Sequence, residues 1–168
     1  MKFRITFLLS LIFVVLFSSA SIANPLVSQI STRTADPLIP IISSKFYVGT
    51  RDSANDEFTW NESNFVPLIP GNTCYSWVVK LDTDRESVQL KEVLVLPSKP
   101  KTWGDVEGML LQHNNRVSVI QKEIKVENGT ILNSWCVSEG DPTGNYKIDV
   151  IVNGVLAKSF SFIVGLKL

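Results

Sequence analysis

The stretch that most constrains the fold is residues 141–164, because apolar and polar residues alternate on both sides of Asn153-Gly154. This is the period of strands that bury one face. The apolar positions are Tyr146, Ile148, Val150 and Val152 before the dipeptide, and Phe160, Phe162 and Val164 after it. Asn and Gly both tolerate positive φ, so Asn153-Gly154 predicts a hairpin turn. A two-residue loop would turn Phe160 and Phe162 to the other face, because a slip of one residue exchanges the faces. We therefore expect a three-residue loop with Gly154 in the left-handed conformation, and Tyr146 close to Phe160.

Upstream, the same alternation predicts an all-β domain in residues 45–168. We expect strands at 45–50, 58–60, 74–81, 87–96, 117–126 and 130–137. Residues 105–112 are expected to be irregular or a short strand, because Gly108 disfavours a helix. Asn128-Gly129 predicts a second hairpin with a two-residue loop that pairs Val126 with Ile131. The fold class is an antiparallel β-sandwich of about seven or more strands.

The N-terminus has the pattern of a secretory signal peptide, residues 1–23. Lys2 and Arg4 precede an apolar run over residues 5–17, and Ser21-Ile22-Ala23 gives small residues at the cleavage positions. The run is shorter than the roughly 20 residues that a transmembrane helix needs. We therefore expect cleavage and an exported protein, periplasmic or secreted. Residues 24–44 contain three prolines and are expected to be an extended lead-in.

The charge balance bears on the class of partner. The sequence has 16 Lys and Arg and 16 Asp and Glu, so loss of Lys2 and Arg4 with the signal leaves a net charge of −2. Nucleic acids and anionic lipid surfaces favour proteins with a basic face, so we expect neither as a partner. No other apolar run is long enough to span a bilayer, so stable membrane insertion after cleavage is not expected.

Cys74 and Cys136 are the two cysteines of the chain, 62 positions apart. In an oxidising compartment two cysteines pair, so we expect one disulfide. Cys74 is three positions from Trp77, and Cys136 is one position from Trp135. Residues an odd number of positions apart in a strand point to opposite faces, so both sulfurs should lie on the face opposite the tryptophans. The disulfide should therefore join strands away from the main aromatic face. Two isolated cysteines and one histidine do not have zinc-site spacing, so no metal is expected.

Residues 141–146, DPTGNY, resemble the entry to the penultimate strand of immunoglobulin-like β-sandwiches. In that family an acidic residue and a Gly precede a corner Tyr whose hydroxyl bonds to nearby backbone. The resemblance implies a structural corner at Asp141, Gly144 and Tyr146. The sequence departs from the family in an extra residue between Asp141 and Gly144, and in Ile148, where antibody domains have their second Cys. The resemblance is thus to bacterial secreted immunoglobulin-like domains in general, and it implies a fold but no particular function.

Two tryptophans are candidate ligand contacts, because Trp60 and Trp103 lie beside loops and among polar neighbours. Such side chains can stack on a sugar or anchor a protein partner. The competing interpretation is that they close the ends of the sandwich. Trp77 and Trp135 are in phase with apolar strand faces and are expected in the core.

The sequence contains no pattern that points to catalysis. His113 is the single histidine and lies in an Asn-rich turn, where a surface role is expected. No nucleophile motif, phosphate loop or dinucleotide fingerprint occurs, and no cofactor is expected. We expect a non-enzymatic exported module with a structural or protein-binding role. The alternatives are a carbohydrate-binding module that uses Trp60 and Trp103, and a secreted enzyme or enzyme inhibitor.

Overall fold

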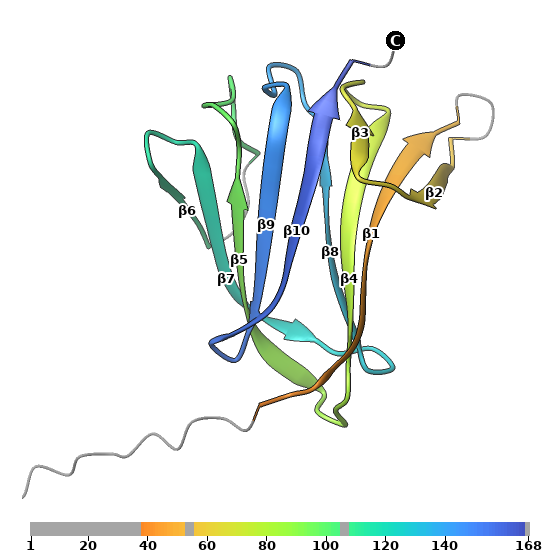
Figure 1. The fold of residues 1–168 in the computed structure, drawn as a ribbon, viewed down its shortest axis with the longest axis vertical. Coiled ribbons are helices and arrows are strands. Elements are labelled where there is room, and N and C mark those ends of the chain that lie inside the picture. Colours follow the sequence, from red (N-terminus) through yellow and green to blue (C-terminus); the bar gives the residue numbers. More distant parts are fainter. Residues whose placement is uncertain (1–37, 53–55, 105–107, 167–168) are drawn as a thin grey trace, which may run out of the picture. The chain divides into compact units, whose positions relative to one another are not determined.

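The structure is a computed structural model that describes residues 38–52, 56–104 and 108–166 (Figure 1). Four strands form one sheet in the order β2 (Phe58–Glu62), β1 (Ile41–Arg51), β4 (Thr73–Leu81) and β8 (Thr130–Cys136). Six strands form the second sheet in the order β3 (Phe65–Pro67), β10 (Val155–Gly165), β9 (Gly144–Val152), β5 (Ser87–Val95), β7 (Val117–Lys125) and β6 (Met109–Gln112). All neighbouring strands are antiparallel except β3 and β10, which are parallel. The all-β sandwich is therefore confirmed.

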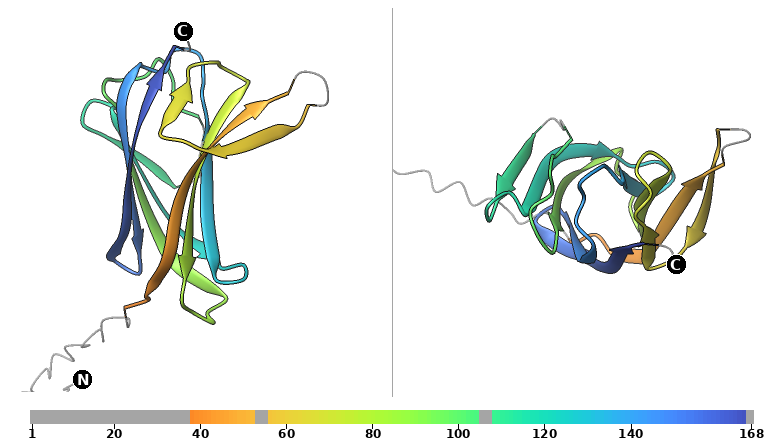
Figure 2. Two further views of the ribbon diagram at one scale, coloured as in Figure 1. Left: turned by 45° about the vertical axis from the view of Figure 1, so that its right-hand side comes forward. Right: turned by 90° about the horizontal axis from the view of Figure 1, so that it is seen from above.

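The core lies between the two sheets, which face each other in both views of Figure 2. It contains the inward residues of both sheets, because successive side chains of a strand point to opposite faces. From the four-stranded sheet these include Phe46, Val48, Tyr75, Trp77, Val79 and Leu81; from the six-stranded sheet they include Leu90, Leu94, Tyr146, Ile148, Phe160 and Phe162. Trp77 is fully buried and Trp135 packs against the core from β8, as predicted.

The β9–β10 hairpin has a different loop from the one predicted. Val152 pairs with Val155, so the loop contains only Asn153 and Gly154, both with positive φ (49° and 82°). The register then shifts by one residue between Leu156 and Lys158, a β-bulge within β10. This bulge turns Phe160 and Phe162 back to the core, an effect that the prediction attributed to a longer loop. As a result Tyr146 lies opposite Phe162, with ring centroids 5.4 Å apart, and not opposite Phe160.

The predicted hairpin between residues 117–126 and 130–137 is wrong in its pairing. The two-residue turn at Asn128-Gly129 is present, and Glu127 pairs with Thr130 across it. Beyond that bridge the strands separate, since β7 pairs with β5 and β6 while β8 pairs with β4. The turn therefore carries the chain from one sheet to the other.

The other strand boundaries follow the predictions with small shifts. β1 begins at Ile41, within the stretch predicted as lead-in, and β6 covers the second half of residues 105–112. The predicted signal, residues 1–23, and residues 24–37 of the lead-in lie outside the described residues. Within the described part, no helix has the length and apolar character to cross a membrane.

Candidate functional site

Trp60 lies on the outer face of the four-stranded sheet, the face turned away from the core. It is directly opposite Gly49 on the neighbouring strand β1, and its indole covers that glycine. A Cβ atom at Gly49 would come within 2.9 Å of the indole ring, closer than real side-chain contacts allow. The glycine therefore lets the indole lie flat on the sheet. One face of the ring remains open, and the residue is 41% exposed.

The register of the sheet explains which side chains surround Trp60. One row across the four strands is Trp60, Gly49, Cys74 and Cys136, and the next is Glu62, Tyr47, Ser76 and Ser134. A third row contributes Lys45, Val78 and Leu132. All these residues share one face, because they occupy every second position of their strands.

A shallow groove of about 280 Å³ lies in this face. It is lined by Tyr47, Trp60, Ser76, Val78, Leu132 and Ser134. Leu132 is 53% exposed, so two large apolar side chains, Trp60 and Leu132, face solvent at the groove. The Ser76 hydroxyl donates to the backbone oxygen of Asn133 at 2.9 Å, which leaves the floor largely apolar. We call these six residues the outer groove.

Charged residues form the border of the outer groove on the β1–β2 side. The Lys45 ammonium lies 3.1 Å from the Glu62 carboxylate, and this hydrogen bond raises the pKa of Lys45. The Arg51 guanidinium lies 5.1 Å from the centre of the Phe58 ring and 2.9 Å from Asp56. An apolar floor with a polar border is the usual anatomy of an interaction surface.

Trp103, the second candidate contact, belongs to a different part of the molecule. It is partly buried against the core, and its ring packs edge-on against Trp135 with centroids 6.3 Å apart. Its indole N–H donates to the backbone oxygen of Asn115 at 2.8 Å. Trp135 points inward from β8, whereas Trp60 lies on the outer face. The structure therefore does not bring Trp60 and Trp103 together in one surface.

Glu92 forms a buried polar cluster that sequence reasoning missed. It is 1% exposed and comes from the inward face of β5. Its Oε2 accepts hydrogen bonds from Trp77 Nε1 at 2.5 Å and from Asn133 Nδ2 at 3.0 Å. Its Oε1 accepts one from Trp135 Nε1 at 2.7 Å. The three donors lie on β4 and β8, so this carboxylate joins the two sheets. The signal in the sequence was its phase, shared with Leu90 and Leu94.

The disulfide between Cys74 and Cys136 is present as predicted. The two residues are opposite each other on the neighbouring strands β4 and β8, on the outer face. It thus links strands within one sheet and avoids the aromatic core, which confirms the expected placement. Cys74 is buried and Cys136 is exposed, and both belong to the same cross-strand row as Trp60.

The corner implied by the resemblance is also present. The Tyr146 hydroxyl donates to the backbone oxygen of Pro142 at 2.7 Å, and burial raises the pKa of Tyr146. Asp141 accepts a hydrogen bond from the backbone N–H of Ser138 at 2.8 Å, and partial burial raises the pKa of its carboxyl. Gly144 has a φ of 133°, with the Pro97 ring against it. These contacts fix the entry to β9.

The remaining polar candidates are dispersed. His113 is exposed in a turn, with a φ of 51°. Asp82 and Asp84, two acidic residues of the loop between β4 and β5, are exposed as well. In the described ranges, no group of three or more His, Cys, Asp or Glu residues could hold a metal ion. The outer groove is therefore the surface that gathers the strongest candidate contacts.

A family model for a β-sandwich domain agrees with the fold. No curated protein matches the sequence. Among solved structures, an immunoglobulin-like protein from Pseudomonas aeruginosa is similar, with 16% sequence identity and a TM-score of 0.49; the match covers 78% of this chain and 99% of that chain. The family model for the PM0630 beta sandwich domain matches residues 44–165. This chain therefore belongs to the PM0630 beta sandwich domain family.

Proposed function

We propose that this protein is an exported, non-enzymatic module that binds a partner protein through the outer groove. The observation that carries the proposal is the exposure of Trp60 and Leu132 on one face of the four-stranded sheet. Large apolar side chains gathered on an exposed face mark interaction sites. Trp and Tyr, both present here, are also the residues that most often dominate binding energy.

The location of the groove supports a scaffold role for the sandwich. The sheet holds Trp60 by pairing β2 with β1, and the Cys74–Cys136 disulfide links β4 and β8, the other two strands of the same sheet. A surface built on strands is pre-organised, so binding loses little conformational entropy. The export part of the proposal is supported by the signal-like N-terminus and by the disulfide.

The proposal is tested by placing a photo-crosslinking amino acid at position 132 in the organism that makes the protein. A covalent partner identified from that position, and absent when the crosslinker replaces Lys91 on the other sheet, gives a candidate for binding measurements. W60A should then weaken that complex by about tenfold or more, the effect of a hot-spot residue. The matched control is F65A, which removes a similarly exposed aromatic residue from β3. Equal affinities for W60A and F65A would contradict the proposal.

Carbohydrate binding is the second candidate, favoured by one observation. The Trp60 indole lies flat over Gly49, and a flat exposed ring can stack on a sugar. The hydroxyls of Tyr47 and Ser134 border it. Binding on a glycan array that is lost in W60A and kept in W103A would select this function. No array signal, together with a crosslinked protein at position 132, would select the first.

A further inference from the structure

The two sheets have open edges that face each other along one side of the sandwich. β3 pairs with β10 only at Ile163–Gly165, and β2 pairs with β1 only from Tyr47 onward. Below these points, within the described residues, no strand pairs with the second edge of β10 or of β1. We call this side, between residues 41–46 of β1 and 156–162 of β10, the seam.

The backbone groups on the β10 side of the seam point outward. The N–H of Ile163 donates to the backbone oxygen of Asn64 at 2.8 Å, so it points away from β9 and toward the edge. Backbone groups two residues apart in a strand point the same way. Ser161 and Ser159 therefore present their N–H and C=O groups to the seam, where β3 no longer covers them. Such a row of free groups is a template for another strand.

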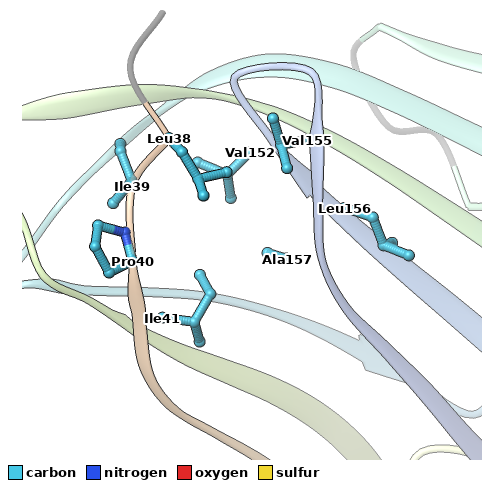
Figure 3. A pocket seen from close by; sticks show the side chains of 8 residues that line it. All are labelled: Leu38, Ile39, Pro40, Ile41, Val152, Val155, Leu156 and Ala157. Carbon is cyan, nitrogen blue, oxygen red and sulfur yellow. The ribbon is translucent and has the colours of Figure 1, made fainter.

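Two hollows follow one another along the seam. The lower one, of about 200 Å³, lies between residues 38–41 and the β9–β10 hairpin. Figure 3 shows residues 38–41 on one side of this hollow and the β9–β10 hairpin residues Val152, Val155, Leu156 and Ala157 on the other. All of these side chains are apolar, so the hollow is apolar. The upper one, of about 310 Å³, is lined by Lys45, Phe46 and Glu62 on one side and by Lys158 and Phe160 on the other.

Lys158 gives the seam a charge preference. Its position on β10 is in phase with the buried Phe160, so it lines the upper hollow on the inward side of the strand. Among the described residues, no carboxylate forms an ion pair with Lys158, whereas Lys45 across the hollow is paired with Glu62. An inward-pointing lysine beside a β-bulge is a device that discourages indiscriminate strand pairing. A strand with a carboxylate opposite this lysine would remove that obstacle.

We propose that the seam binds an extended segment of a partner protein, which adds to β10 as a strand. The segment carries apolar side chains at alternate positions for the lower hollow and one carboxylate for Lys158. Strand addition of this kind obtains affinity from main-chain hydrogen bonds and specificity from alternate side chains. The seam adjoins the outer groove at Lys45 and Glu62 but shares none of its six lining residues, and the inference holds whether or not that groove binds a protein.

The probe is a synthetic eight-residue peptide, blocked at both ends, that alternates valine with threonine and has one central glutamate. We expect binding by isothermal titration, and slower amide hydrogen exchange at Ser159 and Ser161 when the peptide is bound. S161P should weaken binding by about fivefold to tenfold, the value of one backbone hydrogen bond. S161A is the matched control, because it keeps the backbone N–H, and its affinity should equal that of the wild type.

The charge preference is tested separately with K158E. This variant should lose affinity for the glutamate peptide and gain affinity for the same peptide with lysine in the central position. A peptide methylated on the backbone nitrogens that face β10 cannot donate to the carbonyls of that strand. It therefore tests main-chain pairing without altering the protein, and a folding defect in S161P leaves the inference testable.

Four results would overturn the inference. The first is equal binding of the methylated and unmethylated peptides, and the second is no binding to wild-type protein at millimolar peptide. The third is a concentration-dependent dimer that S161P abolishes. The last of these would assign the edge to a second copy of the chain. Protection of the Ser161 amide in the free protein is the fourth, because the edge would then already be occupied.

Discussion

Replacement of Glu92 tests whether its carboxylate holds the two sheets together. In E92L the side chain keeps a similar volume, but Trp77, Trp135 and Asn133 lose their acceptor. Each buried donor left without a partner costs about 1–3 kcal/mol. Trp77 is fully buried, whereas Trp135 and Asn133 are partly exposed and can reach water. The penalty for their unpaired donors should therefore be smaller than the penalty for that of Trp77. We expect E92L to lower the free energy of unfolding by about 2–5 kcal/mol.

The amide variant E92Q should lower the free energy of unfolding by less than E92L does, and the loss should come from one identifiable contact. Its oxygen can still accept from Trp77 and Asn133, as Oε2 does in Glu92, but its NH₂ then faces the indole N–H of Trp135. Two donors facing each other cannot form a hydrogen bond. W135F removes one of them, so it should be less destabilising in the E92Q background than in the wild type. This coupling distinguishes the hydrogen bond from loss of packing.

Urea unfolding followed by circular dichroism, with the disulfide intact, measures these differences. E86Q, at an exposed glutamate, is the control and should change stability by less than about 0.5 kcal/mol. The opposing possibility is that an apolar residue replaces a buried charge at no cost, as occurs in some proteins. An E92L protein as stable as the wild type would refute the reasoning.

Three further variants test features of the outer groove and the corner. G49A should displace the Trp60 indole, because the new Cβ would lie within 2.9 Å of the ring; a shift in the fluorescence of the exposed tryptophan checks this, and an unchanged spectrum would contradict it. Y146F removes the hydrogen bond to the Pro142 oxygen and should cost about 0.5–1.5 kcal/mol in urea unfolding, so wild-type stability would show that the corner bond contributes nothing. Partial burial raises the pKa of Asp141, so its stabilising contribution is greatest at low pH and is lost as pH rises through the folded-state pKa. The stability of the wild type relative to D141N should therefore fall as pH rises from below the ordinary Asp pKa of about 4 through the raised folded-state pKa, and parallel curves would show that the carboxyl does not titrate differently on folding.

The strands were predictable because burial of one face imposes a period of two. Tyr75, Trp77, Val79 and Leu81 alternate in β4 and all lie in the core, so the pattern alone located this strand and its inner face. Asn153-Gly154 likewise located a turn, because both residues adopt positive φ there. The corner at Tyr146 was recognisable because its neighbours are fixed by local geometry.

What the sequence could not reveal depends on contacts between distant strands. The bulge in β10 preserves the burial of Phe160, and several positions before it could have absorbed the extra residue equally well. The separation of β7 from β8 after Glu127 depends on β4 and β5 offering better partners. The outer groove depends on register, because Trp60 and Leu132 come together only once β2, β1, β4 and β8 are aligned.

The placement of the disulfide has a consequence for how the chain reaches its fold. The bond closes a loop that begins in β4 and ends in β8, 62 positions later, and in the unfolded chain such closure is worth roughly 4 kcal/mol. Since both cysteines belong to one sheet, oxidation brings β4 and β8 together in their final alignment but contributes nothing to docking the opposite layer. A reduced chain can therefore still assemble the interior between the layers, and oxidation afterwards locks the alignment of the face that carries Trp60.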